Sequence, residues 1–399
     1  MRLLVLHAVV ALACAGVATI GGCGGSEKPV KQAKTKSKDE KAARALLGQA
    51  RDDAQNGDAD AADEAYGKAY AASKDFEILE EHVDFLIHVG KPARAQQVAK
   101  GYYDAHDTDG KGFKLYAEAL IAGGRGEQAK EVADSLIALD PNNAAGYEKL
   151  GRALVLMDRN EEGVEALRKA VQLDDDNAQY YISLGIALNK IGKVDEAALK
   201  FSDAVKRAPD DATAHAYLGM ARRLQGEPDE AKQHLDKALE LDPNNGRAYF
   251  ELGLLYNAQK KQGEAEIALQ TAVQKSPNES LFWYALGEIY RVQSRAEKAL
   301  AAYKRANEIE PVYPKAPGKY GLLLVEAKKF DEAEAVLTPA VRRDPKNPLN
   351  YLALGGAFAG MRQTKNAIES YEKYLELAPR NDPERDRAQR AISDLKRRR

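Results

Sequence analysis

Residues 178–211 read AQYYISLGIALNKIGKVDEAALKFSDAVKRAPDD, and related 34-residue segments follow one another along most of the chain. Glycine recurs at one place in these segments, 34 residues apart and without an insertion, at Gly151, Gly185, Gly219, Gly253, Gly287, Gly321 and Gly355. Only 31 of the 399 residues are glycine, so chance does not produce this spacing. The chain is therefore built from tandem repeats.

Each repeat is predicted to contain two amphipathic helices. When the recurrent glycine is numbered position 8, apolar or small residues recur at positions 4, 7, 8 and 11, and again at 20, 24 and 27, which is helical spacing. Position 32 is proline in most repeats, and the residue before a proline avoids the α region, so the second helix ends there. Gly124, Gly192 and Gly226 stand at position 15, where a glycine ends the first helix.

This pattern, with alanine at positions 20 and 27 and large residues at 4, 7 and 24, resembles the tetratricopeptide repeat. The resemblance implies an all-α fold, an α-solenoid in which helical hairpins form a right-handed superhelix with a C-terminal capping helix. Two degenerate repeats are expected at 43–109, eight repeats at 110–381, and a capping helix with a basic tail at 382–399. Such repeats bury their core against their neighbours, so one solenoid is expected from residue 43 onward.

The first 42 residues differ from the repeats in composition. Residues 1–22 contain an apolar run that is short for a membrane span and indicates a secretory signal peptide. Ile20-Gly21-Gly22-Cys23 at its end resembles the bacterial lipobox, which implies that Cys23 carries lipid. The alternatives are an ordinary exported protein cut after a small residue and an uncleaved anchor. Residues 23–42 are lysine-rich without apolar periodicity, which predicts a flexible basic linker.

The sequence contains no recognisable catalytic or cofactor motif. Its histidines and two cysteines form no zinc pattern, and neither GxSxG nor a P-loop occurs. The formal net charge of −2 argues against a nucleic-acid-binding protein. Asp84 and His88 stand one helical turn apart and could share a metal, but two ligands do not make a site. The string from Asp107 to Glu118 partly resembles a calcium loop, but the repeat register explains it as a turn between repeats followed by a first helix. We therefore expect no enzyme activity, cofactor, metal or small-molecule substrate.

The candidate binding residues come from the resemblance. In this family, positions 2, 5, 9 and 12 of the first helix face a concave groove that binds peptides or partner domains. The central repeats place these residues there: Ile182, Ile186, Asn189, Met220, Arg223, Phe250, Leu254, Asn257, Tyr284 and Arg291. Amides can pair with a peptide backbone and arginines with carboxylates, so the groove suits a segment with apolar anchors and acidic flanks. The alternative is that these residues only solvate the edge of the groove.

Together these features predict a non-enzymatic scaffold for protein–protein interaction. The expected lipid on Cys23 would tether it to a membrane of the cell envelope, with the outer membrane facing the periplasm as the expected location. Its partners are expected to be proteins, in the assembly of an envelope complex. The alternative is a permanent structural subunit, or a pilotin-like assembly factor, of a secretion, pilus or polysaccharide-export machine. An enzyme is the remaining class.

Overall fold

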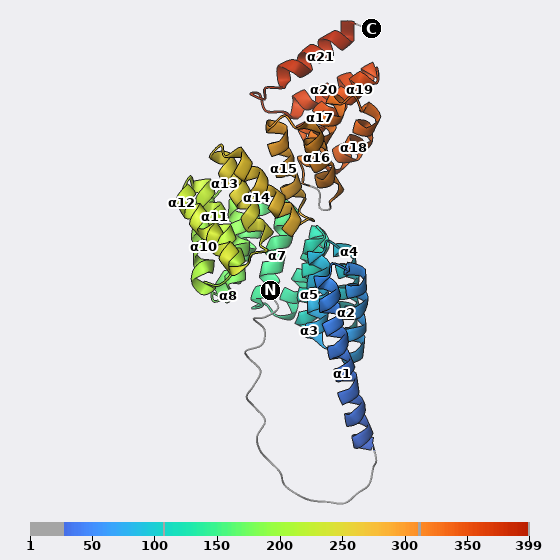
Figure 1. Ribbon diagram of the computed structural model, residues 1–399, viewed down its shortest axis with the longest axis vertical. Coiled ribbons are helices and arrows are strands. Elements are labelled where there is room, and N and C mark those ends of the chain that lie inside the picture. Colours follow the sequence, from blue (N-terminus) through green and yellow to red (C-terminus); the bar gives the residue numbers. More distant parts are fainter. Residues whose placement is uncertain (1–27, 107, 310–312, 398–399) are drawn as a thin grey trace, which may run out of the picture. The chain divides into compact units, whose positions relative to one another are not determined.

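The computed structural model describes residues 28–106, 108–309 and 313–397, and all regular structure in these ranges is α-helical (Figure 1). The chain divides into two compact units, Met1–Ala208 and Pro209–Arg399. The first unit contains α1 Lys28–Gln55, α2 Ala59–Ser73, α3 Phe76–His88, α4 Pro92–Ala105, α5 Gly110–Ala122, α6 Gly126–Leu139, α7 Ala144–Leu156, α8 Asn160–Leu173, α9 Ala178–Lys190 and α10 Val194–Arg207.

The second unit has the same construction. It contains α11 Ala212–Gln225, α12 Pro228–Leu241, α13 Gly246–Ala258, α14 Gln262–Lys275, α15 Ser280–Val292, α16 Ala296–Glu308, α17 Ala316–Glu326, α18 Phe330–Arg343, α19 Pro348–Gly360, α20 Thr364–Leu377 and α21 Arg385–Arg397. In both units each odd-numbered helix pairs with the next even-numbered helix, except that α21 packs alone against α20. The helical hairpins predicted from the sequence are therefore confirmed.

The recurrent glycine brings the two helices of a hairpin close together. A Cβ atom on Gly185 of α9 would lie 2.5 Å from Cε1 of Phe201 on α10. A Cβ on Gly253 of α13 would likewise lie 2.5 Å from Cγ of Leu269 on α14. Since real Cβ atoms do not approach carbon so closely, only glycine fits beside these large side chains.

Local chemistry fixes the turns. Gly192 and Gly226 have φ of +79°, the left-handed conformation in which glycine ends a helix, as predicted. Between repeats, an asparagine or aspartate caps the next first helix. Asn177 Oδ1 accepts a hydrogen bond from Gln179 N at 3.0 Å, and Asn245 Oδ1 accepts one from Ala248 N at 3.0 Å.

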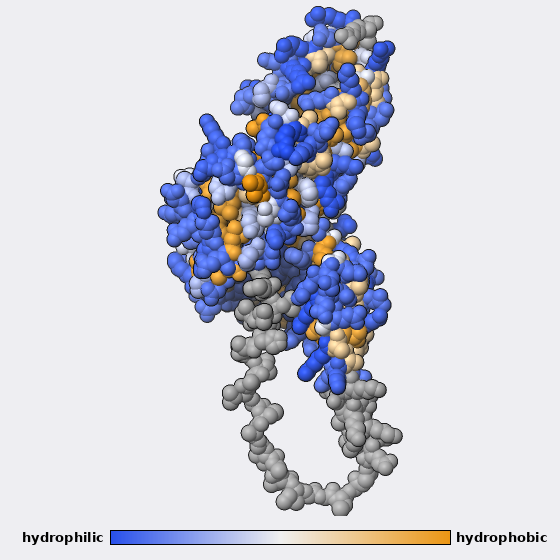
Figure 2. Space-filling model, in the orientation of Figure 1, coloured by the Kyte–Doolittle hydropathy of each residue, from blue (hydrophilic) through white to orange (hydrophobic). Residues whose placement is uncertain are grey.

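The hydrophobic core of each unit lies between neighbouring helices. Buried alanines from the second helices, such as Ala197 and Ala265, sit beside large residues such as Phe201 and Leu269. In Figure 2 hydrophobic residues accordingly appear in narrow strips between hydrophilic helix surfaces. None of the helices in the described ranges is long and apolar enough to cross a membrane.

One expectation for the N-terminal region is wrong. Residues 23–42 were expected to be a flexible linker, but α1 begins at Lys28 and its first half extends past α2 (Figure 1). Pro29 stands in the first turn, where its missing N–H costs nothing, and no glycine or proline follows until Gly48. The lysines, glutamates and alanines between them are good helix formers, so helix continues even without an apolar stripe. Cys23 and the expected signal peptide lie outside the described residues.

Candidate protein-binding face

The odd-numbered helices form a continuous surface within each unit. In the first unit α3, α5, α7 and α9 contact one another in succession. In the second unit α11 contacts α13, and α17 contacts both α15 and α19. We call this surface the first-helix face of each unit.

Three predicted binding residues belong to α9 in the first unit. Ile182 is buried, whereas Ile186 and Asn189 are half-buried. Ile182 therefore serves the core of the protein, and only the other two are accessible to a partner.

Seven predicted binding residues belong to the second unit, and the structure separates them by exposure. Met220 and Phe250 are buried, and the Phe250 ring stacks on Phe282 with centroids 4.4 Å apart. The remaining five are accessible to different degrees: Arg223, Leu254 and Tyr284 are half-buried, while Asn257 and Arg291 are exposed. Of the apolar anchors expected in this unit, Leu254 and Tyr284 are thus the accessible ones.

Arg223 is engaged by a carboxylate of its own chain. Its Nη2 and Nε lie 2.8 and 3.1 Å from Oε2 of Glu251 on α13, whose side chain is only 1% exposed. Arg247 Nη1 lies 3.6 Å from the other oxygen of Glu251. Two guanidinium groups therefore share one buried glutamate.

Arg247 is held by aromatic rings as well as by charge. Its guanidinium carbon lies 5.4, 5.6 and 5.3 Å from the ring centroids of Tyr217, Phe250 and Phe282. Burial alone would lower the pKa of Arg247, but Tyr217 and the carboxylates of Glu251 and Glu279 reverse this and raise it. The side chain stays charged at the surface of α13.

A second cluster of the same kind surrounds Glu288 on α15. Its carboxylate accepts hydrogen bonds from Tyr303 Oη and from Arg291 Nη2 at 3.0 Å, and Lys319 Nζ of α17 lies 3.4 Å away. Desolvation would raise the pKa of Glu288, but the bonds from Arg291 and Tyr303 outweigh it and lower the pKa. Glu288 is therefore ionised, and it also touches two cations.

The first-helix face of the first unit contains a balanced network that sequence reasoning missed. Glu118 Oε2 lies 2.7 Å from Arg152 Nη1 and 2.5 Å from Lys149 Nζ, and these cations hold the pKa of Glu118 at about 2 against desolvation. Glu148 accepts a hydrogen bond from Ser183 Oγ at 2.9 Å and lies 2.9 Å from Lys149 Nζ. The sequence feature that could have predicted this network is the spacing of opposite charges. Lys149 and Arg152 follow Glu118 by 31 and 34 residues, and the repeat places such residues on neighbouring first helices.

Asp84 continues this column of charges on α3. It is exposed, and none of the described residues forms a hydrogen bond or ion pair with its side chain. The surrounding protein nevertheless raises the pKa of Asp84 to about 6, chiefly by desolvation, and Glu80 and Glu118 add negative charge nearby.

The weaker metal candidates find no ligand set in the described residues. No group of three or more His, Cys, Asp or Glu side chains there is placed to hold a metal ion. Asp109 of the calcium-like string caps α5 by accepting from Lys111 N at 2.9 Å, and it also accepts from Tyr102 Oη at 2.6 Å. Asp107 of the same string lies outside the described residues.

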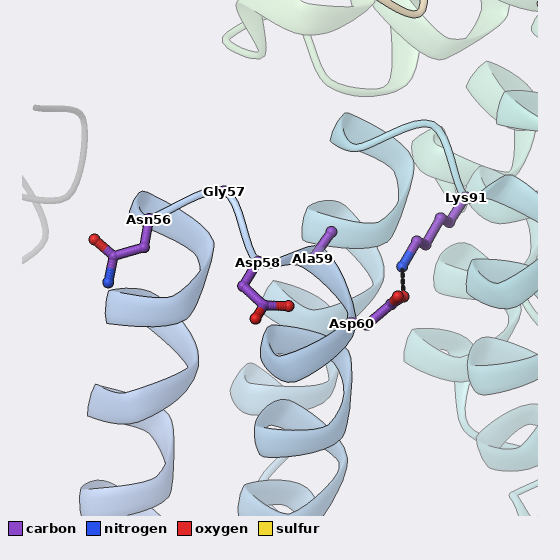
Figure 3. Close-up of a pocket in the computed structure, with 6 residues that line it drawn as sticks. All are labelled: Asn56, Gly57, Asp58, Ala59, Asp60 and Lys91. Carbon is purple, nitrogen blue, oxygen red and sulfur yellow. Dashed lines mark hydrogen bonds and ion pairs between the residues drawn. The ribbon is translucent and has the colours of Figure 1, made fainter.

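Figure 3 shows a shallow depression at the start of α2, lined by Asn56, Gly57, Asp58, Ala59, Asp60 and Lys91. Asp58 caps α2 by accepting from Ala61 N at 3.0 Å, and Lys91 forms an ion pair with Asp60. These groups satisfy one another at a helix turn, so we assign the depression no ligand.

Comparisons with known proteins agree with this architecture. Two family models described as tetratricopeptide repeat match the chain, one at residues 114–178, 149–212 and 182–245 and the other at 222–289. A model described as the cytochrome c-type biogenesis protein H TPR domain matches residues 263–385. No curated protein sequence matches significantly.

Two solved structures share the fold at low sequence identity. The APC/C hetero-tetramer Cut9-Hcn1 contains a chain that is 15% identical, with 88% of this chain and 76% of that chain covered and a TM-score of 0.52. A human IFIT1 dimer with PPP-AAAA contains a chain that is 18% identical, with 85% of this chain and 94% of that chain covered and a TM-score of 0.51.

The fold defines an all-α solenoid of helical hairpins with an accessible face of first helices. Together with the matching family models, the repeat pattern identifies the chain as a tetratricopeptide repeat protein. Its C-terminal repeats resemble the TPR domain of cytochrome c-type biogenesis protein H.

Proposed function

We propose that this protein is a non-enzymatic scaffold of the cell envelope that binds segments of partner proteins on its first-helix faces. The observation that carries the proposal is the first-helix face of the second unit. There Leu254 and Tyr284 are partly accessible beside the exposed Asn257 and Arg291. Apolar anchors surrounded by hydrogen-bonding and charged side chains are what a protein segment requires of its binding surface.

The expected location rests on two sequence features. Residues 1–22 have the composition of a signal peptide, and Cys23 follows a lipobox-like sequence, so the repeats would be tethered to a membrane by lipid. The outer membrane facing the periplasm is the location we propose. The match of residues 263–385 to a cytochrome c-type biogenesis domain also favours the envelope.

That match supports a specific version of the proposal. A scaffold of this kind would hold a partner during cytochrome c assembly, with the segment bound by the repeats of the second unit. The protein would supply binding and orientation, and other proteins would supply the chemistry.

Affinity capture from intact cells after crosslinking tests the proposal. Changing Leu254→Gln together with Arg291→Glu should remove the captured partners, because it alters an apolar anchor and a charge of the first-helix face. Ile267→Gln is the matched control, because Ile267 is an apolar side chain, 66% exposed, on the second helix α14. If the double variant captures the same partners as the wild type while the control loses them, binding occurs on the second helices and the proposal is wrong.

A further inference from the structure

We infer that the first-helix face of the second unit is built to bind an acidic protein segment, one whose carboxylates pair with Arg223, Arg247, Arg291 and Lys319. The inference rests on the proposed scaffold function and specifies the chemistry of the partner. It comes from the arrangement of ion pairs on α11, α13, α15 and α17.

Two of the three glutamates on the first helices of this unit, Glu251 and Glu288, each contact two cations, and the third, Glu326 on α17, is exposed. Glu251 contacts Arg223 and Arg247, and Glu288 contacts Arg291 and Lys319. A single carboxylate balances one positive charge, so the Glu288 cluster keeps one in excess, while at the Glu251 cluster the carboxylate of Glu279 also acts on Arg247. A guanidinium has five N–H donors in a planar fork, so an arginine that already holds one carboxylate can also grip another.

In the Glu251 cluster the cations reach solvent and the carboxylate does not, whereas the Glu288 side chain is 27% exposed beside its cations. The cationic side chains are 17%, 28%, 46% and 26% exposed for Arg223, Arg247, Arg291 and Lys319, respectively. The Glu251 side chain is 1% exposed. A partner approaching the Glu251 cluster therefore meets positive charge over buried negative charge, and at the Glu288 cluster it meets two cations beside one carboxylate.

Charge is also segregated between the two helix layers of this unit. The five first helices, α11 to α19, carry five Lys or Arg and three Asp or Glu, whereas the five second helices, α12 to α20, carry ten Lys or Arg and fourteen Asp or Glu. The second helices thus present net negative charge, and the first helices net positive charge. Such a field draws an acidic segment to the first-helix face and away from the opposite one.

The apolar residues of the face lie among these cations. Leu254 is on α13 with Glu251 and Arg247, and Tyr284 is on α15 with Glu288 and Arg291. The Tyr284 ring packs on Tyr303 and Tyr313 with centroids 5.7 and 4.8 Å away, so its position is fixed before a ligand arrives. The complementary segment has carboxylates on both sides of apolar residues.

A set of labelled probes tests the inference with the full chain. One probe is a synthetic peptide of glutamate and leucine, the second has glutamine in place of every glutamate, and the third is a single-stranded RNA. Fluorescence anisotropy should show the acidic peptide binding at least about tenfold more tightly than the glutamine peptide, with an affinity that falls as salt rises. Equal affinity for the two peptides, or tighter binding of the RNA, would overturn the inference.

Matched variants locate the binding. Arg291→Gln with Lys319→Gln should weaken binding of the acidic peptide about tenfold and reduce its salt dependence. The control variant, Lys232→Gln with Lys237→Gln, removes the same charge from α12. It should change neither the affinity for the acidic peptide nor the salt dependence of that affinity. Circular dichroism checks folding, and if the double variant loses helicity, the single change Lys319→Gln is measured instead. Unchanged affinity in a folded variant contradicts the inference.

These results separate the inference from the proposed function. If partner capture in cells needs Leu254 and Arg291 but the acidic peptide does not bind, the scaffold proposal holds and the acidic-segment inference fails. If the acidic peptide binds through Arg291 and Lys319 but capture is insensitive to this face, the inference holds and the scaffold proposal for this face fails.

Discussion

Gly185 on α9 shows how one missing side chain sets the spacing of a hairpin. A Cβ atom there would lie 2.5 Å from the Phe201 ring, so Gly185→Ala forces the helices apart. We expect this change to lower the free energy of unfolding by about 1–3 kcal/mol.

Gly48 is the matched control, since it lies inside α1 with nothing within 4 Å of an added Cβ. Gly48→Ala should stabilise by about 0.5–1 kcal/mol. Urea denaturation measures both, and similar effects at the two sites would refute the packing explanation.

Asp84 is expected to make stability depend on pH. Its pKa of about 6 in the folded protein lies above the unfolded value of 3.8, so the folded state binds the proton more tightly. Ionised Asp84 therefore destabilises the folded protein. This destabilisation is full above pH 6 and disappears as pH falls toward 4. We expect Asp84→Asn to raise the melting temperature at pH 7.5 and to have little effect at pH 4. Removing the like-charge pair with Glu80 alone contributes about 0.2–0.5 kcal/mol.

Glu118 should change the stability of the protein with pH in the opposite direction to Asp84, so it serves as a comparison within the same protein. Its pKa of about 2 lies below the unfolded value of 4.5, so its stabilisation is present above pH 4.5 and is lost as pH falls toward 2. Asp394→Asn on the exposed side of α21 removes the same formal charge from another helix and is the control for net charge. A melting temperature of Asp84→Asn equal to that of the wild type at pH 7.5 would contradict the account of Asp84.

At the scale of helices, the repeat pattern predicts the hairpins. Small and large residues recur at helical spacing in both helices of a repeat, and this spacing is satisfied when the two helices pack against each other. Gly192 and Gly226 marked the ends of first helices correctly because the left-handed conformation favours glycine. The sequence pattern does not predict the start of α1 at Lys28 because periodicity reports burial, and the side chains of residues 39–42 are exposed.

The candidate site was predictable only in part. Family positions locate the first-helix face, but they do not tell which side chains are covered by neighbours. They therefore predict ligand anchors at Ile182 and Phe250, which are buried. The pairing of Arg223 with Glu251 also escaped sequence reasoning. It joins residues 28 apart, a separation that differs from the 34-residue period.

The last helix, α21, should stabilise the end of the second unit. Ile392 is buried against Tyr371 and Tyr374 of α20, in a cluster that also holds Ala388. Ile392→Ala is expected to destabilise the terminal helices by about 2 kcal/mol, and Ser393→Ala on the exposed side of α21 should change stability by less than about 0.5 kcal/mol. Hydrogen exchange should show faster exchange in α20 for the first variant only. Unchanged exchange in α20 would mean that α21 does not cap the stack.

For the whole molecule, stability is expected to be a sum of local terms. Helices contact mainly their neighbours in sequence, so no single core ties the described helices together. We expect residues 178–313, with the most regular repeats, to be more protected from hydrogen exchange than the degenerate stretch 43–109. Mass spectrometry of exchange resolves the two stretches, and uniform protection from 43 to 395 would show one cooperative unit instead.

The central claim is that partners bind on the first-helix face of the second unit. Site-specific photo-crosslinking in intact cells tests it most directly, with the crosslinking amino acid at the exposed Asn257 of α13 or at the exposed Ile267 of α14. The account predicts a discrete protein adduct at position 257, lost when Arg291→Glu is added, and no adduct at position 267. An adduct at 267 without one at 257 would contradict it.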